Sequence, residues 1–210
     1  MIVSASIQRA QDEAPFPIRQ GVFVAVVGPS GGGKDSVMRY AKERLGSLEA
    51  DIIFARRVIT RPMEPGSEEH DTLDEAGFER RKAAGGFALS WCANGLSYGL
   101  PASVDEAMRQ GKVVVANGSR AVIPEIRARY VHVLPVVITA PREVLAERLS
   151  SRGRETREEM LARLARGTAS ELAVTDGHVI DNSGPLEVAG ERFLETLRKA
   201  AAWSDVCDMV

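Results

Sequence analysis

The chain has 210 residues, of which 44% are hydrophobic, and its formal net charge at pH 7 is −2. This length and composition can supply one full hydrophobic core, and the small net charge gives no overall attraction to nucleic acid or to a membrane surface. The two cysteines, Cys92 and Cys207, are too few for a disulfide framework and are not spaced as a metal site. They favour a reducing, cytoplasmic compartment. Residues 1–20 lack an apolar signal core, so we expect a flexible N-terminal tail.

The first predicted element is a buried strand at 22–27, followed by a glycine-rich turn and a helix over 37–45. In this order of elements, backbone N–H groups cradle the phosphates of a nucleoside triphosphate. Lys34 is expected to neutralise charge on the β- and γ-phosphates and so to act in catalysis. The predicted nucleotide-binding residues of the loop are Gly28, Pro29, Ser30, Gly31, Gly32, Gly33, Lys34, Asp35 and Ser36.

One position departs from the usual loop pattern. Ser or Thr normally follows the lysine and binds Mg²⁺ through its hydroxyl, but here Asp35 follows and the hydroxyl moves to Ser36. Adjacent helical residues point about 100° apart, so Ser36 does not simply replace the missing ligand, whereas a carboxylate binds hard cations well. Asp35 and Ser36 are both candidate metal ligands. The alternative for Asp35 is a charge that stabilises the helix N-terminus.

Beyond this unit, strand and helix patterns alternate, which predicts an α/β fold with a mostly parallel sheet. The further strands are expected at 87–91, 112–116, 133–139 and 178–182, and the helices at 75–84, 102–109, 122–129, 142–150, 157–172 and 186–202. Residues 61–71 form a polar, turn-rich loop. Ligands of parallel sheets collect at the carboxyl ends of the strands. The residues expected to converge there are Gly28, Arg61, Asn117, Thr139 and Asn182.

Four segments of the chain resemble the guanylate kinase-like group of small P-loop kinases. They are the loop at 28–36, the stretch 60–66 that begins Thr-Arg-Pro, the Gly-Leu-Ser-Tyr-Gly segment at 95–99, and the arginine-rich stretch 148–164. The resemblance implies a three-layer P-loop nucleoside monophosphate kinase-like fold with a parallel core sheet. The parts that it implies are one kinase domain at 21–202, an acceptor-binding insertion at about 55–100, a helical lid at about 150–170 and a C-terminal tail at 203–210.

The same resemblance implies that Arg152 and Arg163 are catalytic lid arginines. Arginine and Mg²⁺ both stabilise the charge that phosphoryl transfer spreads over the equatorial oxygens. The alternative for each is a solvated arginine on an exposed helix face. Asn182 is the candidate contact to the adenine of ATP.

Departures from the group concern the phosphate acceptor. Guanylate kinases read guanine with a glutamate, and Leu89 stands at that place. A second phosphate-binding arginine is replaced by Met63-Glu64. With Gly-Lys-Asp-Ser in the loop and Asn-Gly-Ser-Arg from Asn117 onward, the chain resembles the ribose 1,5-bisphosphate phosphokinase family of phosphonate utilisation. That resemblance implies ATP as co-substrate, Mg²⁺, a small phosphorylated sugar as acceptor, and 5-phospho-α-D-ribose 1-diphosphate as product.

A basic pocket would suit an acceptor with two phosphates and no base. The candidate acceptor-binding residues are Arg57, Thr60, Arg61, Tyr98, Asn117 and Arg120. Plainer readings compete: Arg57 as a strand-edge charge, Arg120 at a helix start, Asn117 as a turn residue, and Tyr98 with Trp91 as core packing. Two other functions stay open, a guanylate kinase with an unusual base pocket and a kinase-like binding module without turnover. No sequence feature decides whether the chain is a homodimer.

Overall fold

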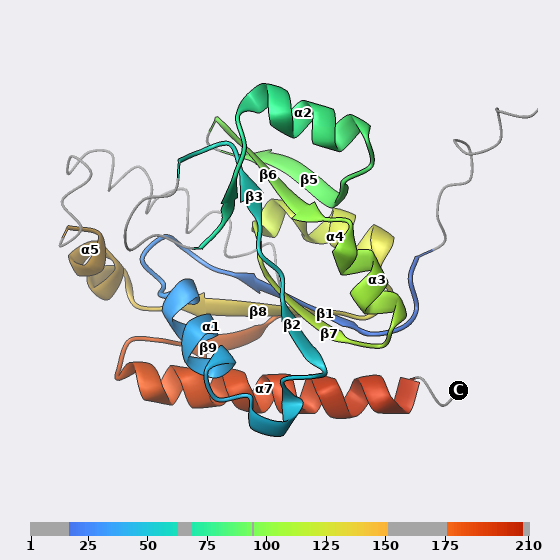
Figure 1. The fold of residues 1–210 in the computed structure, drawn as a ribbon. Coiled ribbons are helices and arrows are strands. Elements are labelled where there is room, and N and C mark those ends of the chain that lie inside the picture. Colours follow the sequence, from blue (N-terminus) through green and yellow to red (C-terminus); the bar gives the residue numbers. More distant parts are fainter. Residues whose placement is uncertain (1–16, 63–68, 94, 151–175, 208–210) are drawn as a thin grey trace, which may run out of the picture.

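The computed structural model describes residues 17–62, 69–93, 95–150 and 176–207. Its centre is a five-stranded sheet of order β2-β7-β1-β8-β9 in which every pairing is parallel (Figure 1). The strands are β1 (Val22–Val27), β2 (Ile52–Phe54), β7 (Val113–Asn117), β8 (Val133–Thr139) and β9 (His178–Asp181). The predicted α/β fold with a parallel core sheet is thereby confirmed.

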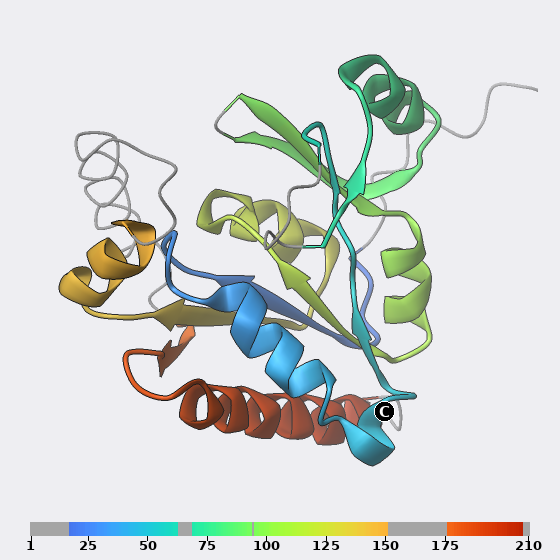
Figure 2. The same ribbon diagram turned by 60° about the vertical axis from the view of Figure 1, so that its left-hand side comes forward.

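Helices cover both faces of this sheet, giving three layers (Figure 2). The helices are α1 (Lys34–Lys42), α2 (Glu75–Ala83), α3 (Ser103–Arg109), α4 (Ile123–Arg129), α5 (Arg142–Ser150) and α7 (Leu186–Cys207), with 3₁₀ turns at Gly46–Leu48 and Arg120–Val122. Alternate residues of β1 point to opposite faces. Val24 therefore packs in the cluster with α1 and α7, while Phe23 packs in the cluster with α3 and α4.

A second, smaller sheet of order β4-β3-β6-β5 lies over the α3 and α4 side of the core (Figures 1 and 2). Its strands are β3 (Val58–Ile59), β4 (Asp71–Thr72), β5 (Phe87–Ala93) and β6 (Leu96–Pro101). Ala88 and Leu100 from this sheet join the same buried cluster as Phe23 of the core sheet. Helix α2 lies on the outer side, where Phe78 stacks on Phe87 at 4.6 Å between ring centroids.

A buried charge cluster ties α3 to the end of α4. The carboxylate of Asp105 accepts hydrogen bonds from Nε of Arg129 at 2.8 Å and from the hydroxyl of Tyr130 at 2.7 Å, and it also pairs with the Arg129 Nη2 group. Burial raises the pKa of Asp105, but the hydrogen bonds from Arg129 and Tyr130 outweigh it, so the pKa lies below its usual value. Burial and the Asp105 carboxylate raise the pKa of Tyr130.

Three expectations need correction. Ile18, placed in the flexible tail, forms a parallel bridge with Tyr130, because its backbone exchanges hydrogen bonds with 129 and 131. Helix α7 runs to Cys207 instead of ending at 202, since Trp203 packs edge-on against His132 and Ser204 donates to the Gly111 carbonyl at 2.5 Å. Arg61 follows β3, which belongs to the smaller sheet and not to the core sheet.

The other described helices begin and end within three residues of the predicted bounds. The predicted helix at 157–172 lies outside the described residues. Within the part of the chain that is described, no helix is both long and apolar enough to cross a membrane.

Candidate active site

The turn between β1 and α1 has a backbone that only glycine accommodates at its tightest points. Gly33 begins α1 with φ 84°, and a Cβ atom there would lie 2.3 Å from Nδ2 of Asn182. Gly28 has φ 145°, and a Cβ atom there would lie 2.0 Å from the carbonyl oxygen of Ile138. The strand, glycine loop and helix therefore follow in the predicted order. The N-terminus of α1 presents backbone N–H groups and a partial positive charge, the combination that binds phosphate.

Lys34 is the first residue of α1, and its side chain folds back across the loop. Its Nζ donates to the carbonyl oxygens of Gly28 at 3.0 Å and Pro29 at 3.1 Å. These contacts keep the ammonium group at the loop itself, where it can neutralise phosphate charge.

Two side chains, those of Asn182 and Arg148, form hydrogen bonds to the backbone of the loop. Asn182, only 4% exposed, donates its amide to the Gly32 carbonyl at 2.8 Å. Arg148 on α5 donates to the Asn182 carbonyl at 2.8 Å and to the Gly31 carbonyl at 3.5 Å. The structure thus gives Asn182 a part in shaping the loop, and its contact with adenine stays a prediction. Arg148 belongs to the kinase-like arginine-rich segment, but sequence reasoning selected other arginines from that segment.

A cavity of about 320 Å³ opens beside the loop. The residues that line it are Gly31, Gly33, Ser36, Arg148, Asn182, Gly184 and Leu186. Its mixture of backbone, hydroxyl, cationic and apolar surface suits the nucleoside part of a nucleotide whose phosphates lie in the loop. Ser36 therefore faces this cavity.

Asp35 points elsewhere, toward the core sheet. Its Oδ1 accepts a hydrogen bond of 2.9 Å from Nδ2 of Asn117, which is 5% exposed at the carboxyl end of β7. The acceptor contact of Asn117 stays a prediction, and the amide contact with Asp35 is a pairing that the sequence did not predict. The Asp35 residue is otherwise exposed, so a carboxylate oxygen is available to a hard cation at the edge of the loop, and the residues present fit Mg²⁺.

Magnesium in phosphoryl-transfer sites is usually held by one or two carboxylates together with substrate phosphates. Among the described residues, no group of three or more His, Cys, Asp or Glu side chains comes together as a metal site.

Arg57 lies under an aromatic pair of the smaller sheet. Its guanidinium lies 5.1 Å from the ring centroid of Tyr98 and 6.0 Å from that of Trp91, and the residue is 9% exposed. The two rings stack on each other at 5.6 Å with an interplanar angle of 8°. Tyr98 is thus both part of a packed aromatic pair and a neighbour of an arginine, so neither of its two sequence readings excludes the other.

Arg61 is held through its backbone and carries a buried polar atom that lacks a partner. Its carbonyl accepts hydrogen bonds from the ring of His70 and the hydroxyl of Thr72, each at 3.1 Å. Its Nε is buried without a hydrogen-bond partner. Leaving such a donor unsatisfied is costly, and an anion would satisfy it. Sequence reasoning missed His70 and Thr72, since no local pattern distinguishes them from the polar residues around them.

The remaining predicted residues fall into two groups. The Thr60 hydroxyl accepts the backbone N–H of Ser97 at 2.9 Å, which joins the Arg61 loop to β6. Arg120 is 8% exposed in the 3₁₀ turn after β7. Arg152 and Arg163 lie outside the described residues, as does the predicted lid.

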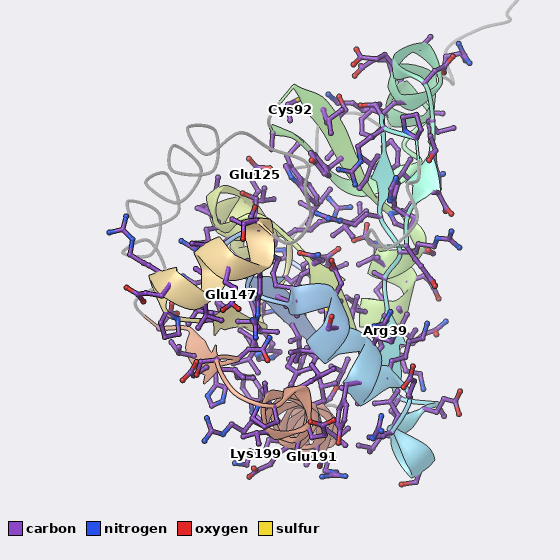
Figure 3. The ribbon with its side chains drawn as sticks, turned by 90° about the vertical axis from the view of Figure 1, so that its left-hand side faces the viewer. Arg39, Cys92, Glu125, Glu147, Glu191 and Lys199 are labelled. Atoms are coloured by element: carbon purple, nitrogen blue, oxygen red, sulfur yellow. The ribbon has the colours of Figure 1, made fainter. Side chains whose placement is uncertain are left out.

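Figure 3 views the molecule from the loop side, with α1 carrying Arg39, α5 carrying Glu147, and the β5–β6 hairpin carrying Cys92.

Several known proteins match this chain over most of its length. A family model described as an AAA domain matches residues 24–167. Over 207 residues the chain is 73% identical to a ribose 1,5-bisphosphate phosphokinase from Chelativorans sp. (strain BNC1), and the match covers 99% of both chains. Over 182 residues it is 50% identical to the protein of that name from Brucella melitensis biotype 2 (strain ATCC 23457), covering 87% of this chain and 94% of the relative. The chain belongs to the ribose 1,5-bisphosphate phosphokinase family.

A solved guanylate kinase from Anaplasma phagocytophilum resembles this ribose 1,5-bisphosphate phosphokinase family member in fold. The TM-score is 0.59 with 20% sequence identity, and the match covers 86% of each chain. Leu89 stands at the position where a guanine-binding glutamate is expected in guanylate kinases. It pairs with Leu100 across β5 and β6 and packs on the core cluster. An apolar, partly buried side chain offers no hydrogen bond to a guanine edge.

Proposed function

We propose that this protein transfers the γ-phosphoryl group of ATP to ribose 1,5-bisphosphate, giving 5-phospho-α-D-ribose 1-diphosphate and ADP in phosphonate catabolism. The observation that carries the proposal is the 73% identity, over 99% of the chain, with a relative named for that activity. The glycine loop with Lys34 supports it, because the reaction needs a triphosphate donor and such a loop binds the phosphates of one.

On the donor side, the amides of the loop and Lys34 hold the β- and γ-phosphates, and the neighbouring cavity takes the nucleoside. Asp35 is the residue we assign to Mg²⁺, because Asn117 holds its carboxylate at the end of β7 while Ser36 lines the nucleoside cavity. When held by Asp35, Mg²⁺ would supply positive charge that neutralises the charge developing during phosphoryl transfer.

On the acceptor side, Arg57, Arg61 and Arg120 supply positive charge for two phosphates on a small sugar. The buried Nε of Arg61 supports this assignment, since a phosphate oxygen would supply the hydrogen bond it lacks. Tyr98, whose ring lies beside Arg57, would donate its hydroxyl to an acceptor phosphate. Thr60 joins the Arg61 loop to β6.

No strong general base is required for the transfer. The acceptor phosphate is already anionic near neutral pH, since second phosphate pKa values lie near 6. Positioning and charge neutralisation by the residues above then dominate the rate. Arg152 and Arg163 are proposed to close over the transferring group, in keeping with the family resemblance of their segment.

The test compares acceptors with the full chain and Mg·ATP. ADP release is measured with ribose 1,5-bisphosphate, with GMP and with no acceptor. We expect turnover only with the bisphosphate, and formation of the diphosphate product confirms the step. Comparable turnover with GMP would instead support a guanylate kinase, and ATP binding without turnover on either acceptor would support a binding module.

We also place the enzyme in the cytoplasm, on the strength of its low cysteine content. A homodimer is a separate prediction, tested by light scattering on the full chain.

A further inference from the structure

Trp91 has no part in the function proposed above, yet it stands beside an acceptor arginine. In the register of the β5–β6 hairpin it lies directly opposite Tyr98. Their rings stack nearly parallel, and the guanidinium of Arg57 lies near both ring centroids. The three side chains come from β5, β6 and the residue before β3, so they join all three antiparallel-paired strands of the smaller sheet.

The position of Trp91 follows from the strand. Its neighbour Cys92 is exposed on the hairpin (Figure 3). Because successive strand residues point to opposite faces, Trp91 points the other way, where it packs against the buried cluster of the core. The indole therefore fills the space between that core cluster and the Tyr98 ring.

A cation over an aromatic ring is attracted by the negative face of the ring. The guanidinium of Arg57 makes such contacts with Tyr98 at 5.1 Å and with Trp91 at 6.0 Å, and these contacts restrict where it lies. The backbone of Arg57 is fixed as well, since its carbonyl accepts the N–H of Asp71 at 2.8 Å. With backbone and guanidinium both held, less entropy is lost when a phosphate binds.

We propose that Trp91 is a positioning residue for the acceptor: it holds Tyr98, and with it the guanidinium of Arg57, in the orientation that receives one phosphate of the sugar bisphosphate. The identity of that acceptor rests on the proposed function. The effect of Trp91 on anion binding by Arg57 does not.

The kinetic test uses Trp91→Leu and Trp91→Phe in the full chain. Loss of the ring should raise KM for ribose 1,5-bisphosphate about 3- to 30-fold, the range expected from loss of a cation–π contact, while kcat and KM for ATP stay within about 2-fold. Trp91→Phe should keep KM for the acceptor close to the wild-type value, since it keeps an aromatic face. Trp203→Leu is the matched control, because it removes the other tryptophan, which is 49% exposed and packs on His132.

A second measurement does not depend on turnover. In a Trp203→Phe background Trp91 is the only tryptophan of the chain, and its emission is followed while inorganic phosphate or ribose 1,5-bisphosphate is added without ATP. We expect a saturable change that Arg57→Leu abolishes. This fluorescence measurement tests the inference even if Trp91→Leu fails to fold.

The outcomes separate the two ideas. If the bisphosphate is not turned over but phosphate still changes the Trp91 emission through Arg57, the proposed function fails and this inference stands. If turnover is normal while folded Trp91→Leu keeps the wild-type KM for the acceptor, or saturating acceptor leaves the emission unchanged, the inference is overturned and the function stands.

Discussion

Asn117, at the carboxyl end of β7, donates an amide hydrogen bond of 2.9 Å to the carboxylate of Asp35, the residue that follows the loop lysine. The two residues are 82 positions apart in the chain. Asp35 stands where such a loop usually carries the hydroxyl ligand of Mg²⁺. The contact with Asn117 orients the Asp35 carboxylate. The contact therefore links the carboxyl end of β7 to the proposed metal position.

Asn117→Leu is expected to raise the Mg²⁺ concentration needed for half-maximal activity about 10-fold, because residues that orient a metal ligand typically contribute 10- to 100-fold to metal affinity. Asp35→Ser should shift the same titration further or alter its metal preference. Ser36→Ala is the control and should leave it unchanged, since Ser36 lines the cavity beside the loop. Mg²⁺ titrations of ADP release, with direct Mn²⁺ binding as a second readout, check this. A shift in Ser36→Ala but not in Asp35→Ser would reverse the assignment.

Lys34→Ala should lower kcat by at least about 100-fold, the usual loss when a group that stabilises transferring charge is removed. The fold should persist, because the lysine side chain is only partly buried, and its hydrogen bonds to Gly28 and Pro29 are made to carbonyls of the loop. Lys42→Ala, at the exposed end of the same helix, serves as the matched control and should keep full activity. ADP release and thermal unfolding are measured on both variants. Equal activity of the two would contradict the proposed role of the loop.

Gly33→Ala and Gly46→Ala separate backbone strain from crowding. Both glycines have left-handed backbones, with φ 84° and 58°, so each alanine should cost about 1–2 kcal/mol of unfolding free energy. Only Gly33→Ala also meets the amide of Asn182, whereas nothing lies within 4 Å of Gly46. Gly33→Ala should therefore be the less stable variant in urea and should raise KM for ATP. Equal stability and equal KM would refute the crowding at Asn182.

Asp105→Asn tests the buried charge cluster through pH. The pKa of Asp105 is lowered in the folded state, so its stabilisation is present above the unfolded value of about 3.9 and is lost as pH falls through the folded pKa. At pH 7 the variant should lose about 3 kcal/mol, since it leaves Arg129 partly buried without its charge partner. The difference from wild type should shrink below about pH 4.

The control for this experiment is Asp51→Asn, which breaks a more exposed pair with Lys112 at 3.1 Å. Its loss should stay below about 1 kcal/mol at pH 7. Urea unfolding followed between pH 3 and pH 8 compares the two. A difference at Asp105 that is constant with pH would show that packing, and not charge, carries the cluster.

The sequence by itself determined the phosphate loop and the class of fold. Both predictions rest on local patterns: a valine-rich run before the glycines, Lys34 directly after them, and strand and helix periods that alternate along the chain. Such patterns can be recognised without knowing any tertiary contact. The missing glutamate at Leu89 was equally legible, because it is a single letter at a counted distance from Tyr98.

Only the tertiary structure decided how the chemically active side chains pair. The amide of Asn117 contacts Asp35, and that of Asn182 contacts the loop backbone; the sequence pattern predicted neither pairing. Arg61 follows a strand of the smaller sheet, and Trp91 meets Tyr98 through strand register. These contacts join residues distant in sequence, so they depend on register and side-chain packing, which local propensity does not encode.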